Sequence, residues 1–182
     1  MHKLTIEEMN RISVEQFRAV KKMPLVVVLD NVRSANNVGS IFRTADAFRV
    51  ANILLCGITP VPPSNELHKT ALGAEESVSW QYYKDTLQAV EELRKQNYLI
   101  LSVEQVKDST LLQNWKVDVS RPTALILGNE VFGVGQEVVN ASDGCLEIPQ
   151  FGTKHSLNVA CTTSIVLWEF ARQYMGLLPV PF

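Results

Sequence analysis

The chain has 182 residues, of which 46% are hydrophobic and 20% charged, values that indicate one globular domain with its own core. The formal net charge of −2 means that any nucleic-acid partner must be bound by a local basic patch. No apolar run approaches the roughly 20 residues of a membrane span, and the polar start resembles no signal peptide, so we expect a cytoplasmic protein without a membrane partner. The spacing of Cys56, Cys145 and Cys161 argues against disulfides and zinc, and we expect all three to be buried thiols.

The first 22 residues are predicted to form a short helical extension. Thr5 to Glu8 and Ser13 to Gln16 both match the S/T-x-x-E/Q capping box, which predicts two short helices. The extension over residues 1–22 then precedes one domain over residues 23–182.

Apolar runs alternate with amphipathic stretches through the rest of the chain. The helix after the first strand has apolar residues spaced for one buried face, Asp85 is expected to cap a helix ending near Gln96, and a final helix runs from Ser156 to before Gly176. Strands are predicted over residues 25–29, 53–56, 98–103, 123–127 and 145–148. This order predicts an α/β fold with a mostly parallel sheet and helices on both faces.

Polar residues follow three of the predicted strands, at turns where α/β sheets build ligand sites. In the first turn, Asn37 suits a helix cap, Gly39 permits close approach of another group, and Arg43 lies within reach of an anion near the helix start. An ordinary capped helix with a solvated arginine explains this turn equally well.

The second turn, residues 128–135, matches neither G-x-G-x-x-G nor the phosphate loop, which argues against a nucleotide phosphate and a dinucleotide oxidoreductase. Glu130 leaves a buried strand with no evident local partner, as carboxylates that orient groups or transfer protons often do. A first-turn glutamate that favours the next helix dipole is the alternative.

The third turn places a polar loop directly before the hydrophobic final helix. Ser156 is expected to cap that helix, and Asn158 offers a donor and an acceptor toward the loop. A lone His155 is more often solvated than catalytic, and no cluster of ligating residues predicts a metal.

Taken together, the three turns resemble the motifs of the SpoU family of RNA 2′-O-ribose methyltransferases, in the SPOUT (α/β-knot) superfamily. The resemblance runs from about Leu25 to Tyr174, and all three motifs occur in order. They are N-x-G-x-x-x-R at Asn37, Gly39 and Arg43; G-x-E-x-x-G at Gly128, Glu130 and Gly133; and I-P-x-x-G-x-x-x-S-L-N-V from Ile148 to Val159.

The resemblance implies a methyltransferase domain over residues 23–182 with a C-terminal trefoil knot. S-adenosylmethionine is expected to bind largely to backbone groups near Val103, Gly128, Ile148 and Leu157. A homodimer through the last helix is also implied. That helix is apolar nearly all round until Glu169, which fits an interface, although burial in the core of one chain is the alternative.

The implied reaction is attack of a ribose 2′-hydroxyl on the sulfonium methyl group. The family pattern assigns site positions to Arg43, Glu130, Ser156, Asn158 and Asn37. Because a guanidinium has a pKa above about 12, we expect Arg43 to clamp a phosphate and stabilise developing oxyanion charge rather than act as a base.

The expected partner is RNA, with tRNA favoured over rRNA because the short N-terminal extension leaves no room for a separate RNA-binding domain, and no DNA partner is expected. Val131 and Phe132 are bulkier than the family pattern leads us to expect, which affects the choice of substrate. A non-catalytic RNA-binding or assembly protein is the alternative, disfavoured by the presence of both Arg43 and Glu130. Basic residues gather before position 50 as a possible RNA-facing patch, or as a mixed solvated surface: Arg11, Arg18, Lys21, Lys22, Arg33, Arg43 and Arg49.

Overall fold

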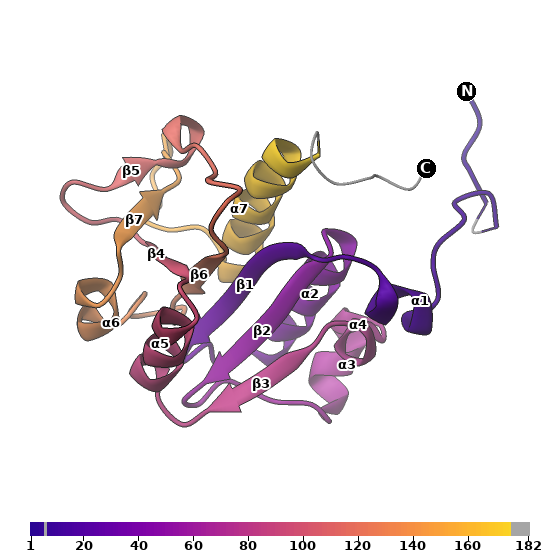
Figure 1. Ribbon diagram of the computed structural model, residues 1–182, viewed down its shortest axis with the longest axis horizontal. Coiled ribbons are helices and arrows are strands. Elements are labelled where there is room, and N and C mark those ends of the chain that lie inside the picture. Colours follow the sequence, from indigo (N-terminus) through magenta and orange to yellow (C-terminus); the bar gives the residue numbers. More distant parts are fainter. Residues whose placement is uncertain (6, 176–182) are drawn as a thin grey trace.

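The computed structural model describes residues 1–5 and 7–175 and contains one sheet in which every pair of neighbouring strands is parallel (Figure 1). The order of its seven strands is β3-β2-β1-β6-β4-β7-β5. They are β1 (Met23–Asp30), β2 (Val50–Cys56), β3 (Trp80–Tyr83), β4 (Leu99–Val103), β5 (Thr110–Leu111), β6 (Thr123–Leu127) and β7 (Gly144–Glu147). The predicted α/β class is confirmed, and the trefoil knot stays a prediction.

Helices cover both faces of the sheet, as predicted. Helices α1 to α4 and α7 pack on one face, and α5 and α6 pack on the other. They are α1 (Val14–Ala19), α2 (Ala35–Ala47), α3 (Asn65–Ala71), α4 (Ala74–Ser77), α5 (Thr86–Lys95), the 3₁₀ turn η1 (Leu112–Asn114), α6 (Gln136–Asn140) and α7 (Val159–Tyr174). Within residues 1–5 and 7–175 no helix has the length and apolar character of a membrane span.

Strand β1 shows why the two layers form. Its side chains alternate, so that Leu25, Val27 and Leu29 enter the core beneath α2 and α7 while Val26 and Val28 enter the core beneath α5. A strand that is apolar at every position must be covered on both faces. The continuous apolar run in the sequence therefore places β1 in the middle of the sheet.

Only one of the two predicted N-terminal helices forms. The capping box of Ser13 and Gln16 starts α1, whose Phe17 is 4% exposed and packs in the core. Thr5 and Glu8 also exchange capping hydrogen bonds, but only a turn at residues 7–10 follows them. The described side chains of this turn are exposed, and an isolated turn without packing is too short to persist as a helix.

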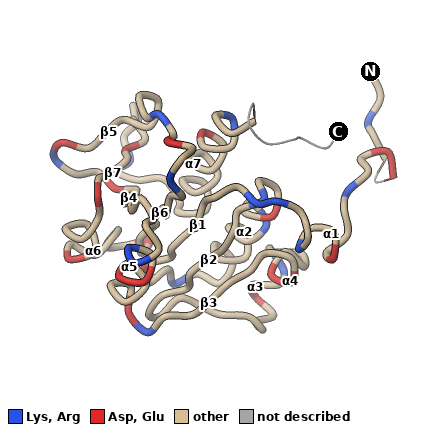
Figure 2. Tube along the Cα trace, viewed as in Figure 1, with Lys and Arg blue, Asp and Glu red and all other residues tan. Residues whose placement is uncertain are grey.

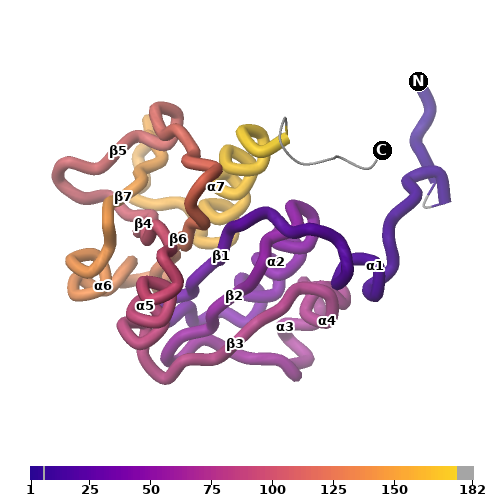
Figure 3. Tube along the Cα trace, in the orientation of Figure 1, coloured from indigo at the N-terminus to yellow at the C-terminus, as the bar shows by residue number. Residues whose placement is uncertain are grey.

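Helix α3 was not predicted, and it explains Gly39. A Cβ atom at Gly39 would lie 2.2 Å from the carbonyl oxygen of Leu67 and from Oγ1 of Thr70, both in α3. The close approach expected at this glycine is therefore made by a helix of the same chain. Helix α2 also lies beside α7 (Figure 3), and Thr44 Oγ1 is 3.2 Å from Ser164 Oγ across this contact.

The expectation of three buried thiols is wrong for Cys161. Cys56 is buried in β2, and burial raises the pKa of its thiol to about 12. Cys145 is partly buried, whereas Cys161 is exposed in the first turn of α7. The apolar sequence around Cys161 did not reveal which of its residues face outward.

Candidate active site

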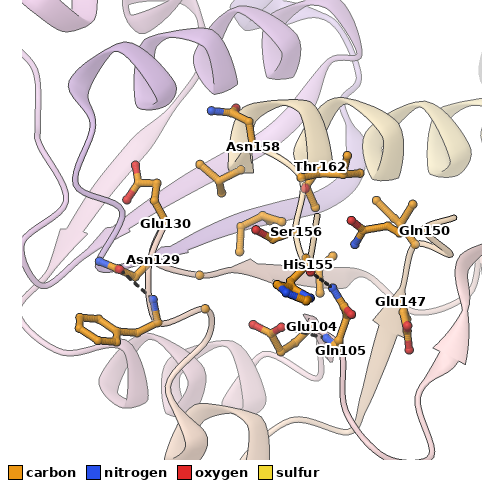
Figure 4. A pocket seen from close by; sticks show the side chains of 18 of the residues that line it. Glu104, Gln105, Asn129, Glu130, Glu147, Gln150, His155, Ser156, Asn158 and Thr162 are labelled. Carbon is orange, nitrogen blue, oxygen red and sulfur yellow. Dashed lines mark hydrogen bonds between the residues drawn. The ribbon is translucent and has the colours of Figure 1, made fainter. Parts of the chain in front are cut away.

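A cleft of about 520 Å³ opens where β4, β6 and β7 reach the carboxyl edge of the sheet, in front of the first turn of α7 (Figure 4). The sheet edge, the turn after β6 and the segment before α7 all contribute to its walls. Each residue predicted to contact the cofactor lies in this wall, namely Val103, Gly128, Ile148 and Leu157. Their contact with a cofactor stays a prediction.

Glu130 joins the turn after β6 to the start of α2. Its Oε2 accepts a hydrogen bond from the backbone N–H of Arg33 at 2.9 Å. Its Oε1 accepts from the backbone N–H of Ser34 at 3.0 Å and from Nδ2 of Asn37 at 2.9 Å. The side-chain oxygen of Asn37 in turn accepts from Nδ2 of Asn158 at 3.1 Å. Glu130, Asn37 and Asn158 therefore form one chain of hydrogen bonds across the three predicted motifs.

The two helix caps predicted at this site, Asn37 and Ser156, are each replaced by another residue. Ser34, not Asn37, caps α2, because the amide of Asn37 is engaged by Glu130 and Asn158. Asn158, not Ser156, caps α7, and its Oδ1 accepts from two backbone N–H groups of the first turn. The capping predictions for Asn37 and Ser156 are therefore wrong.

Residues 128–133, here called the 128–133 loop, are closed on themselves. The backbones of Asn129 and Gly133 exchange two hydrogen bonds of 2.9 Å, and Oδ1 of Asn129 accepts from the N–H groups of Val131 and Phe132. A Cβ atom at Gly128 would lie 2.1 Å from the backbone carbon of Gly133, so this position requires glycine. The loop thus holds Glu130 in a defined place.

The charge of the cleft is negative. Glu104, Glu130 and Glu147 line it, and no Lys or Arg is among the described residues of its wall. Partial burial acts to raise the pKa of Glu130, but hydrogen bonds from Arg33, Asn37 and Ser34 outweigh it and hold the pKa below its usual value. Glu130 is therefore ionised at neutral pH, and its oxygens are already occupied, which suits a positioning residue better than a base.

Of the other predicted residues, Ser156 and Asn158 line the cleft, as does His155, whereas Arg43 does not. Arg43 is exposed on α2, six residues after Asn37. Helix geometry places it about 9 Å further along the axis and about 120° around it from Asn37. Within the described part of the chain its guanidinium makes no hydrogen bond or ion pair. The structure thus brings Asn37, Glu130, Ser156 and Asn158 together and leaves Arg43 apart.

The sequence profile of the SpoU rRNA Methylase family matches residues 24–168. The chain belongs to this family. It is 30% identical over 167 residues to a tRNA (guanosine(18)-2′-O)-methyltransferase of Thermus thermophilus, covering 91% of this chain and 84% of that one. It is 28% identical over 171 residues to the 23S rRNA (guanosine-2′-O-)-methyltransferase RlmB of Haemophilus influenzae, covering 93% and 68% of the two chains. The AdoMet-bound rRNA methyltransferase of Sinorhizobium meliloti superposes with a TM-score of 0.78 at 29% identity, covering 89% of this chain and 60% of that chain.

Two residues of this SpoU-family cleft were missed by sequence reasoning. Glu104 accepts a hydrogen bond from the backbone N–H of Val134 at 2.9 Å, which supports the 128–133 loop from the side of β4. Gln105 donates to the carbonyl oxygen of His155 at 2.7 Å and links the end of β4 to the third motif. Both directly follow a buried strand, the same signal that singled out Glu130. No group of three or more His, Cys, Asp or Glu is placed to hold a metal in the part of the chain that the structure describes.

The basic residues before position 50 do not form one patch (Figure 2). Lys22 and Arg49 lie together where β1 begins, since Met23 N–H donates to the carbonyl oxygen of Arg49. Arg33 follows the opposite end of β1, roughly 25 Å away at the usual rise of a strand. Lys22 is also occupied, because its ammonium donates to the carbonyl oxygens of Phe17 and Val20. Only Arg33 adjoins the cleft directly.

Proposed function

We propose that this protein is an S-adenosylmethionine-dependent methyltransferase that modifies a ribose 2′-hydroxyl of RNA. The observation that carries the proposal is the hydrogen-bonded chain of Glu130, Asn37 and Asn158 at the mouth of the cleft. It joins residues from all three motifs, and relatives of the chain are named as tRNA and 23S rRNA (guanosine-2′-O)-methyltransferases.

The cleft fits S-adenosylmethionine in size and charge. Its volume of about 520 Å³ lies within the usual range of cofactor sites. Three carboxylates and no Lys or Arg in the described wall suit a cationic sulfonium and disfavour the anionic phosphates of a dinucleotide. Backbone groups near Val103, Gly128, Ile148 and Leu157 would hold the cofactor, which supplies an activated methyl group when bound.

The residues of the chain then position the reacting hydroxyl. Ionised Glu130 fixes Asn37, and Asn37 fixes the amide of Asn158 at the head of α7. Ser156 makes no side-chain hydrogen bond to the described residues, so its hydroxyl is available to the ribose or to the cofactor. Alignment of the 2′-oxygen with the methyl group is the main contribution expected from these side chains.

Arg43 does not line the cleft of its own chain, and we infer that it serves the cleft of a second chain. Helix α7 presents an exposed apolar face beside α2, which includes Ile165, 41% exposed, and Trp168, 50% exposed. Burial of this face in a homodimer would place Arg43 at the interface, where it can reach the cleft of the partner. There the guanidinium would clamp the phosphate next to the target ribose and stabilise the developing oxyanion.

The proposed substrate is a tRNA rather than an rRNA, in the cytoplasm. Relatives are named for both kinds of RNA, and the one named for tRNA is covered over 84% of its length, against 68% for the one named for 23S rRNA. A non-catalytic RNA-binding or assembly protein with the same fold remains the second candidate. The observation that favours this second candidate is that the bulky Val131 and Phe132 line the cleft, where they reduce the space for a cofactor.

The test is transfer of a radiolabelled methyl group from S-adenosylmethionine to bulk tRNA and to bulk rRNA, followed by digestion to nucleosides. We expect a 2′-O-methylnucleoside from tRNA, with Asn158→Ala inactive and Glu91→Gln, an exposed side chain on α5, fully active. Incorporation of label into rRNA alone would overturn the proposal that tRNA is the substrate. Binding of RNA without any methyl transfer would favour the non-catalytic protein, and no calorimetric binding of the cofactor would end the proposal.

A further inference from the structure

A second cleft of about 770 Å³ lies on the other side of the 128–133 loop. Asn129, Phe132 and Gly133 line both clefts, so the loop that carries Glu130 is a wall shared between them. A ligand in the second cleft would therefore be separated from the proposed methyl donor by the thickness of one loop. Gly133 of the second motif lines this second cleft, whereas Asn37, Glu130 and Asn158 do not.

Phe132 is the most conspicuous residue of this wall. Its side chain is 84% exposed, yet its backbone is fixed, since its N–H donates to Oδ1 of Asn129 at 3.2 Å within the closed loop. Ile58, also exposed, lines the same cleft, and its N–H donates to Oδ1 of Asn31 at 3.2 Å. Phe132 and Ile58 line the same cleft, so these two exposed apolar side chains can both contact one ligand there.

The charges of the second cleft differ from those of the first. Arg33 and Lys84 line it, and neither forms an ion pair within residues 1–5 and 7–175. Of its carboxylates, Asp30 is 4% exposed and accepts hydrogen bonds from Asn31, Thr86 and Gly135. The other two carboxylates lie at helix starts: Asp85 accepts from a backbone N–H where α5 begins, and Glu137 lies in the first turn of α6. Arg33 and Lys84 are thus available to a ligand, as is the exposed carboxylate of Glu137, which makes no hydrogen bond or ion pair to the described residues.

We propose that the second cleft binds one unpaired nucleotide of the RNA next to the methylated one, with its base stacked on Phe132 and its phosphates near Arg33 and Lys84. This inference rests on the proposed function. A fixed aromatic ring beside two cations matches a nucleotide, because unpaired bases stack on aromatic side chains and phosphates require positive charge. Arg33 links the two sites, since its backbone N–H is bonded to Glu130 of the first cleft.

The first test compares Phe132→Ala with Phe132→Tyr in methyl transfer to whichever of bulk tRNA and bulk rRNA is the better acceptor. Loss of a base–aromatic stack should raise the KM for RNA about 5- to 150-fold, whereas kcat should change less. The KM for RNA is measured at saturating S-adenosylmethionine, because Phe132 also lines the first cleft, and the Tyr variant should behave as wild type. Leu72→Ala, which removes an exposed apolar side chain outside both clefts, is the matched control. An unchanged KM in Phe132→Ala would overturn the stacking role.

The second test measures binding of fluorescein-labelled RNA by anisotropy and needs no methyl transfer, so it separates failure of this site from failure of the proposed function. The probes are a single strand of about 12 nucleotides and its duplex. Phe132→Ala should weaken single-strand binding and leave duplex binding unchanged. Arg33→Ala and Lys84→Ala should each lower the slope of log affinity against log salt by about 0.7 for the single strand. Equal loss on both probes, or unchanged slopes, would overturn the nucleotide site even if the wild-type enzyme methylates RNA.

Discussion

Replacing Glu130 with Gln should destabilise the fold by separating the turn after β6 from the start of α2. The carboxylate accepts three hydrogen bonds of 2.9 to 3.0 Å, two at Oε1 and one at Oε2. A glutamine has a single acceptor oxygen, so at least one of these donors would face an NH₂ group. A hydrogen bond to a charged group contributes about 1.5–3 kcal/mol. Because Glu130 is exposed and water recovers part of this, we expect a loss of about 1–2 kcal/mol in the free energy of unfolding at pH 7.

The stability difference between wild type and E130Q should depend on pH. Hydrogen bonds hold the pKa of Glu130 below its ordinary value of 4.5, so the stabilisation is complete above pH 4.5 and is lost as the pH falls through the folded-state pKa. The difference between wild type and E130Q, measured by urea unfolding, should therefore narrow below pH 4.5. E91Q, which alters an exposed side chain on α5, should match wild type throughout. Equal stability of E130Q and E91Q at pH 7, or a gap that stays constant on acidification, would refute the reasoning.

Three further predictions address the 128–133 loop, the thiols and the proposed dimer. Gly128→Ala should abolish binding of S-adenosylmethionine, because its Cβ would lie 2.1 Å from backbone atoms across the loop, and an unchanged calorimetric affinity would contradict this. Cys161 is exposed on α7, the helix proposed to form the dimer interface, so its alkylation, measured by mass spectrometry, should rise with the fraction of monomer seen by size-exclusion chromatography. Cys56 is buried and its thiol has a pKa of about 12, so it should react only on unfolding. Refolding an equal mixture of R43A and N158A should restore about a quarter of wild-type activity if Arg43 serves the cleft of its partner. No recovery would place Arg43 in the site of its own chain.

Where the sequence carries a complete local signal, the fold follows it closely. Strand β6 was predicted with the bounds that the structure has, because its apolar run is enclosed by Pro122 and Gly128. Helix α3 was missed because only two of its seven residues, Leu67 and Ala71, are buried, which is too few for a visible period. Strand β3 was missed because it lies at the edge of the sheet and has no fully buried side chain.

The candidate site was predictable as a set of residues but not as a geometry. Motif spacing indicated that Glu130, Ser156 and Asn158 meet, and they do lie around one cleft. The cap of α2 could not be read from the sequence, since the choice between Ser34 and Asn37 depends on Glu130, 93 residues away from Asn37. The position of Arg43 outside the cleft could not be predicted from the local sequence either, because it depends on which face of α2 meets solvent or a second chain.

The hydrogen bond between Asn37 and Asn158 spans 121 residues of chain. During synthesis, Asn37 therefore cannot meet Asn158 until the chain through the start of α7 has left the ribosome. Contacts so distant along the chain form late and slowly in folding. A nascent or prematurely terminated product that lacks α7 thus has no assembled centre.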